Sequence, residues 1–187
     1  MRLVLLGLLL ATASSAVAGE WFQHRFGEAR AYHGSWLAVC TRKGEGKCRA
    51  VQLAGTDGAD GARRLAVHVD RPGQYVVTIF QRGWLPAPGE FVNFDVDGET
   101  DALREGEWTP GDRHIPNVAE MITVSSDAAN ARLVADLKAG RQARFFMGGG
   151  SAGVLEARFD LRGITAAINA IEPASVASIH PFQCRAG

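Results

Sequence analysis

The stretch "RQARFFMGGGSAGVLEARFDL", residues 141–161, decides between two folds. Its centre, residues 149–153, has the Gly-x-Ser-x-Gly spacing of a hydrolase nucleophile, and Asp160 and His180 follow Ser151 in the chain order of such a triad. A nucleophile of this type sits on a sharp turn from a strand into a helix. Here apolar and polar residues alternate on both sides of the glycines, which predicts a hairpin of two strands. We therefore expect Ser151 to be a loop residue, and Asp160 to lie on a polar strand face.

The same alternation recurs along the chain in short runs separated by Gly, Pro and Asp. "RLAVHVD" (64–70) and "FVNFDVDG" (91–98) each have one apolar and one polar face, as in a sheet that is buried on one side. "YVVTIF" (75–80) is apolar on both faces and is expected at the centre of a sheet. "GSWLAVC" (34–40) and "KCRAVQL" (47–53) add two more strands. The pattern predicts a mainly β fold, an antiparallel β-sandwich-like domain with one or two short helices.

Two segments interrupt the β pattern with helical spacing. Residues 125–140 offer Ser or Asp as an N-cap near position 126 and a glycine stop at Gly140. Residues 162–173 place isoleucines and alanines on one face before Pro173, which is expected to end the second helix. The polar stretch from 99 to 117 is predicted to be a long loop.

The first 18 residues have the features of a secretory signal. One positive charge at Arg2 precedes an apolar run and small residues that end in Ala16-Val17-Ala18, which predicts cleavage after Ala18. The apolar run is shorter than the roughly 20 residues that span a bilayer, so no membrane span is expected in the exported product. We expect a single domain over 19–173, a C-terminal tail over 174–187, and a periplasmic or secreted location.

Charge and residue spacing indicate no cofactor, metal or nucleic-acid site. The chain has 20 basic and 20 acidic residues, without the basic excess typical of nucleic-acid-binding proteins. Asp95 and Asp97 are expected on a solvated strand face. The five histidines show no metal-ligand spacing, and they are His24, His33, His68, His114 and His180.

An exported chain meets an oxidising compartment, where cysteines pair. Cys40 and Cys48 lie at the facing ends of two predicted strands, and we expect a disulfide between them. Cys184 is then unpaired in the tail, either as a free thiol or as a bridge between two chains. Pairing of Cys40 with Cys184 is the main alternative, because sequence alone does not fix connectivity.

Two tryptophans are candidates for contact with a partner. Trp84 lies in a proline-bearing connection between strands and Trp108 in the predicted long loop. An exposed indole at such a position could anchor a partner. The alternative for Trp84 is that it folds back over the edge of the sheet, whereas Trp36 and Phe94 fall within strands and are expected in the core.

Taken together, the motifs resemble the invasion-associated locus B family of bacterial envelope proteins. The resemblance extends over residues 34–172. It depends most on a W-x-x-x-C motif followed closely by a second Cys and a Gln, a helix-Gly-strand unit, and F-x-L-x-G before an Ala-rich helix, which here involve Trp36, Cys40, Cys48, Gln52, Gly140, Phe159, Leu161 and Gly163.

The resemblance implies a periplasmic or secreted β-sandwich-like domain, and the family name associates such domains with entry of bacterial pathogens into host cells. It implies no catalytic residue. Family members often carry a second cysteine pair after the strand that corresponds to 91–98. This chain has no cysteine there, which weakens transfer of a specific invasion role.

We therefore expect a non-enzymatic exported protein, envelope-associated or host-interacting, whose partner is a protein or a cell-surface component. A periplasmic inhibitor or carbohydrate-binding module that works through loops around Trp84 and Trp108 is the alternative. A small serine hydrolase that uses Ser151 is the third hypothesis.

Overall fold

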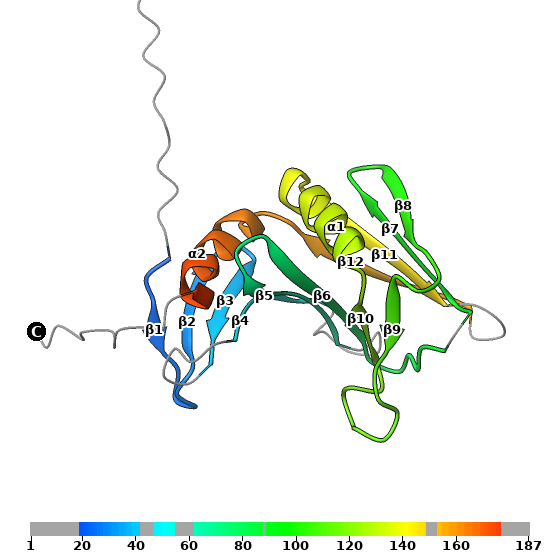
Figure 1. Ribbon diagram of the computed structural model, residues 1–187, viewed down its shortest axis with the longest axis horizontal. Coiled ribbons are helices and arrows are strands. Elements are labelled where there is room, and N and C mark those ends of the chain that lie inside the picture. The colour runs from blue at the N-terminus through cyan, green and yellow to red at the C-terminus, as the bar shows by residue number, and fades with distance from the viewer. Residues whose placement is uncertain (1–18, 42–46, 55–61, 88, 149–152, 177–187) are drawn as a thin grey trace, which may run out of the picture.

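The chain folds into two antiparallel β-sheets and two α-helices (Figure 1). The computed structural model describes residues 19–41, 47–54, 62–87, 89–148 and 153–176. The larger sheet has eight strands in the order β1-β2-β3-β4-β5-β6-β10-β9, and the smaller has four in the order β12-β11-β7-β8. The predicted fold class, a mainly antiparallel β-sandwich-like domain with short helices, is confirmed.

The alternating runs of the sequence form most of the larger sheet. "YVVTIF" lies in β6, which has a neighbour on each side, in agreement with its two apolar faces. "GSWLAVC" and "KCRAVQL" supply β3 and β4, which pair antiparallel as expected. The strands of this sheet are β1 (Phe22–Gln23), β2 (Ala29–His33), β3 (Trp36–Cys40), β4 (Cys48–Ala54), β5 (Arg63–Arg71), β6 (Gln74–Gln81), β9 (Trp108–Pro110) and β10 (Met121–Val124).

The smaller sheet contains the hairpin predicted from residues 141–161. β11 (Gln142–Gly148) and β12 (Val154–Asp160) pair antiparallel over their full length, so strand is followed by strand and not by helix. Ser151 itself lies outside the described residues. The sheet is completed by β7 (Phe91–Val96) and β8 (Glu99–Leu103).

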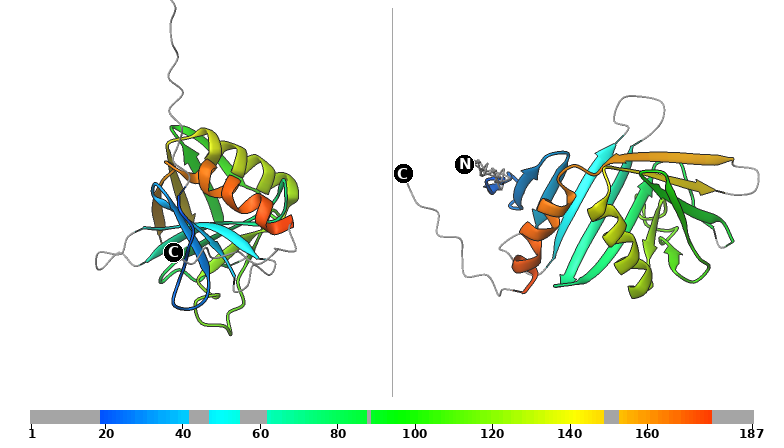
Figure 2. Two further views of the ribbon diagram at one scale, coloured as in Figure 1. Left: turned by 90° about the vertical axis from the view of Figure 1, so that its left-hand side faces the viewer. Right: turned by 90° about the horizontal axis from the view of Figure 1, so that it is seen from above.

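Both helices lie on one side of the larger sheet, as the view from above shows (Figure 2). α1 (Asp127–Ala139) packs on β6, and α2 (Ile164–Val176) packs on β3, β4 and β5. Their apolar faces are buried together with the inward side chains of both sheets, including Trp36 and Phe94 as predicted. One continuous core therefore joins the two sheets and the two helices.

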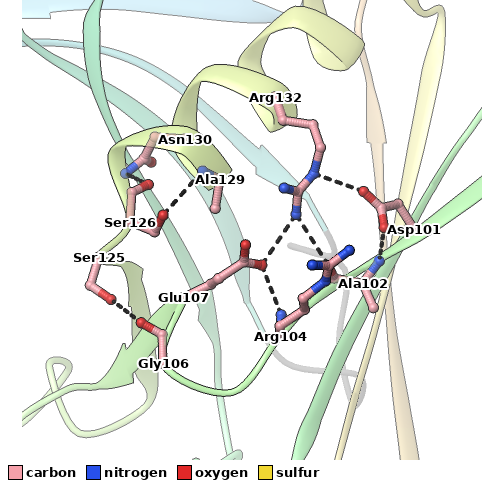
Figure 3. A network of polar contacts seen from close by, with 10 residues as sticks. All are labelled: Asp101, Ala102, Arg104, Gly106, Glu107, Ser125, Ser126, Ala129, Asn130 and Arg132. Atoms are coloured by element: carbon pink, nitrogen blue, oxygen red, sulfur yellow. Dashed lines mark hydrogen bonds and ion pairs between the residues drawn. The ribbon is translucent and has the colours of Figure 1, made fainter.

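The start of α1 shows how local sequence fixes this arrangement (Figure 3). Ser126 is the predicted N-cap, and its hydroxyl accepts a hydrogen bond from the Ala129 amide. Asn130 is 2% exposed, and its side chain accepts from the Val77 amide at 2.8 Å and donates to the Val124 carbonyl at 2.9 Å. The register of β6 with β10 stops one residue short of Val77 and Val124. The Asn130 amide therefore joins the two strands where their direct pairing ends.

Residues 99–117 are not one long loop, and that prediction was wrong. They contain β8, which pairs with β7, and β9, which pairs with β10. Arg132 of α1 holds this segment (Figure 3): its Nε forms an ion pair with Asp101 at 2.8 Å, and its Nη2 donates to Glu107 Oε2 at 3.2 Å. The first three residues of β8 are all exposed, so the strand lacks the alternation by which a strand is identified from sequence.

α2 also differs from the prediction, because it continues through Pro173 to Val176. A proline in a helix removes one main-chain donor. The helix is held before that point by Ile164, Ile168 and Ile171, which are at most 1% exposed. None of the helices in the described part of the chain is long and apolar enough to cross a membrane.

Candidate functional site

Three residues of the family-like motifs, Trp36, Gln52 and Gly163, meet at one joint between the two sheets. The indole Nε1 of Trp36 donates to the Asp160 carbonyl at 2.8 Å, and Gln52 Nε2 donates to the same oxygen at 2.9 Å. Trp36 is fully buried and Gln52 is 6% exposed. These two hydrogen bonds connect β3 and β4 of the larger sheet to the end of β12. Trp36 and Gln52 therefore have a structural role.

Glycines allow the joint to close. Gly163 has φ +99°, and a Cβ built there would lie 1.8 Å from the His33 carbonyl oxygen. Gly34, with φ +60°, would place a Cβ 2.6 Å from the Arg162 carbonyl oxygen. Ser35, between these turns, donates from its hydroxyl to Asp160 Oδ2 at 2.9 Å. Any side chain at 34 or 163 would force the two turns apart.

Cys40 and Cys48 are directly opposite each other on β3 and β4 and form a disulfide in the structure. Their Cα atoms are 4.1 Å apart. The bridge closes the hairpin on the buried side of the larger sheet, since both cysteines belong to the core. Cys184 lies outside the described residues.

The two tryptophans proposed as partner contacts are buried in the described conformation. Trp84 is 3% exposed, and its Nε1 donates to Glu90 Oε2 at 3.0 Å. Trp108, at the start of β9, is 9% exposed and packs in the core. Neither indole offers a surface in this conformation, and their contact with a partner stays a prediction.

The geometry around Ser151 does not favour a hydrolase. The strand-to-helix turn of a nucleophile elbow is replaced by a β11–β12 hairpin. Asp160 accepts hydrogen bonds from Ser35 and Arg162, and bonding to the Arg162 side chain, which outweighs the effect of burial, lowers the pKa of Asp160 far below its usual range. His180, like Ser151, lies outside the described residues.

Asp95 is not on a solvated face, and that prediction was wrong. It is 6% exposed and forms an ion pair with Arg144 Nη2 at 3.1 Å, with a further hydrogen bond from the Gly98 amide. Asp97 has φ +53° and accepts from the amides of Arg141 and Gln142. The Asp95 carboxylate thus stabilises the turn between β7 and β8, and the Asp97 carboxylate connects that turn to the start of β11. Within the described ranges, no three His, Cys, Asp or Glu side chains form a metal-binding group.

The surface best suited to a partner is the side of the larger sheet that faces away from the helices, which we call the open face. Successive strand residues point to opposite sides, so the neighbours of the core residues Ala50, Leu65, Val67 and Val77 point there. The open face consists of Arg49, Val51 and Leu53 of β4, Arg64, Ala66 and His68 of β5, Val76, Thr78 and Phe80 of β6, and Met121 and Thr123 of β10.

Arg64 lies in the row of open-face residues formed with Leu53, Phe80 and Met121, without an acidic partner among the described residues. Its guanidinium carbon is 5.2 Å from the centre of the Phe80 ring, and Nη2 is 3.8 Å from the Met121 sulfur. Several other arginines of this chain pair with carboxylates, as Arg132 and Arg144 do. The donors of Arg64 are therefore held on an aromatic platform and remain available to an anion.

The open face is positive and partly desolvated. Asp70, at the end of β5 and with its side chain outside the described part, is the one acidic residue in the sequence of β4, β5, β6 and β10. Burial, followed by the positive charges of Arg49, Arg64 and Lys47, lowers the pKa of His68 to about 4, so this imidazole is neutral at pH 7. Burial and then Arg49 lower the pKa of Arg64. A negative charge placed here would relieve this mutual repulsion.

Two antiparallel sheets, with both helices on one side of the larger sheet, define a class of β-rich domain. A solved structure has a similar fold. Invasion associated protein B from Bartonella henselae has a similar fold, with a TM-score of 0.52 and 16% sequence identity. The likeness covers 76% of this chain and 94% of that chain. No family model matches the sequence, and no curated protein matches it. The comparison therefore supports the fold that the motif resemblance implied, and membership of that family stays a prediction.

Sequence reasoning missed the open face. The run 64–70 shows which residues share a face, but it does not show that Arg64 lies beside Phe80 and Met121 and away from carboxylates. That arrangement depends on the register of β5 with β6 and of β6 with β10. The available signal was the scarcity of acidic residues on the polar side of consecutive strands, where Asp70 is the one carboxylate in the runs 47–53, 64–70 and 75–80.

Proposed function

We propose that this protein is an exported, non-enzymatic binding module of the bacterial envelope that engages an acidic partner, a protein or a cell-surface component, through the open face. The observation that carries the proposal is Arg64, which lies stacked on Phe80 without a carboxylate partner in the described part of the chain. Arginines in such settings are enriched among the residues that dominate binding energy.

Apolar residues around Arg64 add to the case. Leu53 is 63% exposed and lies directly opposite Arg64 on the neighbouring strand. A partner that covers both residues would bury apolar area and pair the guanidinium at the same time. The alternative of an inhibitor or carbohydrate-binding module required exposed indoles, and burial of Trp84 and Trp108 leaves it without a supporting observation.

Export is part of the proposal. The Cys40–Cys48 bridge is compatible with an oxidising compartment. The signal segment, residues 1–18, lies outside the described residues. We expect a mature chain that begins at Gly19, and intact-mass measurement of the exported protein tests it. A mass that still includes residues 1–18, or a lipid, would contradict export as a free protein.

Binding is tested with immobilised mature protein and two ligand sources. The first is poly-L-glutamate, with poly-L-lysine as the oppositely charged control, and the second is an envelope extract of the producing bacterium. Arg64→Ala should weaken binding about 10- to 30-fold, the loss typical of an arginine that dominates binding energy. Arg64→Glu should abolish it, and added salt should weaken the wild type.

Arg141→Glu is the matched control, because it makes the same charge change at an exposed position just before β11 of the smaller sheet. It should leave binding unchanged. Equal loss with Arg141→Glu and Arg64→Glu would mean that net charge, not the open face, governs binding. Wild-type protein that retains neither poly-L-glutamate nor an extract component would refute the proposal.

A further inference from the structure

β12 forms a seven-residue outer edge of the smaller sheet, beyond which the described structure has no further strand (Figure 2). Such an edge presents main-chain donors and acceptors that can pair with another strand. Val154 and Arg158 are well exposed, with 62% of Val154 and 65% of the Arg158 side chain accessible. This edge is the strongest candidate for an interaction surface outside the open face.

The register shows which main-chain groups point outward. Leu161 donates to the Arg141 carbonyl, so in this antiparallel pair the odd-numbered residues of β12 bond to β11. The even-numbered residues, including Glu156 and Arg158, direct both N–H and C=O away from the sheet. The Asp160 carbonyl also points outward, and it already accepts from Trp36 and Gln52. The free part of the edge therefore extends from Val154 to Arg158.

The charges of β12 select one register for pairing with an identical strand. Glu156 and Arg158 lie on the same strand face and form an ion pair with 2.7 Å between Oε1 and Nε. In a two-fold antiparallel pair centred on Ala157, Glu156 lies opposite Arg158 of the second copy, and the reverse also holds. Registers centred on residue 156 or 158 would place like charges opposite each other, which is unfavourable.

We propose that two copies of this chain associate through their β12 edges, with a two-fold axis at Ala157. Glu156 and Arg158 then exchange four main-chain hydrogen bonds and two charge pairs across the axis. The same register places Leu155 opposite Phe159 on the apolar face. The two four-stranded sheets become one continuous sheet of eight strands, a self-complementary interface of the kind that closes a dimer.

The size of this interface sets the expected strength. Pairing is limited to the free part of the edge because the joint occupies Asp160, so the contact is smaller than a permanent dimer requires. We therefore expect a reversible dimer whose population rises with concentration. Sedimentation velocity on the full mature chain, from low micromolar to about 1 mM, measures it. Cys184→Ser is present in every sample to exclude an intermolecular disulfide.

Charge reversal tests the register. Arg158→Glu and Glu156→Arg each place like charges across the axis and should lower the association constant at least about 10-fold. The double variant, with both changes, restores opposite charges and should recover the dimer. Glu99→Arg makes the same change as Glu156→Arg on the other edge strand, β8, and should leave association unchanged.

Circular dichroism confirms that each variant is folded. A wild-type chain that stays monomeric to the highest concentration would overturn the proposal. It would equally be overturned by a dimer that tolerates both single reversals, or by a double variant that fails to recover. The proposal does not depend on the open face, so its failure would leave the binding function untouched.

Discussion

Replacement of Asn130 by alanine should be one of the more damaging single polar substitutions in this protein. The Asn130 side chain makes three hydrogen bonds, with the Val77 amide and with the carbonyls of Val124 and Ser126, at 2.8, 2.9 and 3.1 Å. A net contribution of about 1 kcal/mol for each bond gives a loss near 3 kcal/mol, much of it from the buried Val77 N–H that is left without a partner. For a domain of this size, that corresponds to a fall in Tm of roughly 6–12 °C.

Two neighbouring serines calibrate the measurement (Figure 3). Ser126→Ala removes the N-cap of α1 and should lower the free energy of unfolding by about 1 kcal/mol. Ser125→Ala removes only an exposed hydrogen bond to the Gly106 carbonyl and should change it by less than about 0.5 kcal/mol. Urea denaturation of the three variants and the wild type measures all of these values. If Asn130→Ala unfolds within error of Ser125→Ala, the amide does not join β6 to β10, and the reasoning is refuted.

Three further predictions concern the cysteines, the serine loop and pH. Reduction of the Cys40–Cys48 bridge should lower Tm by several degrees, because closure of so short a loop contributes roughly 2–3 kcal/mol; peptide mapping without reductant checks the pairing, and a fragment that links Cys184 to either cysteine would contradict it. Ser151→Ala should leave fold and binding unchanged, and labelling of the wild type, but not of the variant, by a serine-directed covalent probe would contradict this. The folded pKa of His68 is about 4, below its unfolded value near 6.5, so stability should be lost as pH falls from about 6.5 to 4. His68→Gln should reduce that loss, as thermal melts across this range would show.

The sequence predicted the strands well where one face is buried. In the runs 64–70 and 91–98, the residues of the predicted apolar face are all buried, although Ala66 and Asp95 of the opposite face are buried as well. In the run 75–80, an apolar character on both faces marks a strand inside the sheet. Both caps of α1 were also predicted correctly, because Ser126 and Gly140 bond to residues within four positions in the chain. A strand or a helix cap can be predicted from sequence when the residues that determine it lie within a few positions of one another.

The missed features depend on partners that are distant in the chain. β8 was not recognised because its exposed residues do not alternate, and it is held instead by Arg132, about 30 residues away. Asp95 was expected in solvent because Asn93 and Asp97, two positions away on the same predicted strand face, are polar, whereas Arg144 of the adjacent strand covers it. The isolation of Arg64 from carboxylates is likewise a property of sheet register. The pattern of apolar and polar residues within one segment cannot indicate contacts with residues of another strand or helix.

The joint between the sheets also determines the order in which the fold can be completed. The hydrogen bonds of Ser35 and Trp36 with Asp160 connect residues 125 and 124 positions apart. The early hairpin of β3 and β4 therefore has no acceptor for its indole until β12 has been synthesised and paired. Closing so long a segment of chain is entropically demanding, and folds dominated by such contacts form slowly. A chain interrupted before residue 160 would leave Trp36 and Gln52 without their shared acceptor, and that incomplete state is the one in which the apolar side of the sheet is open to aggregation.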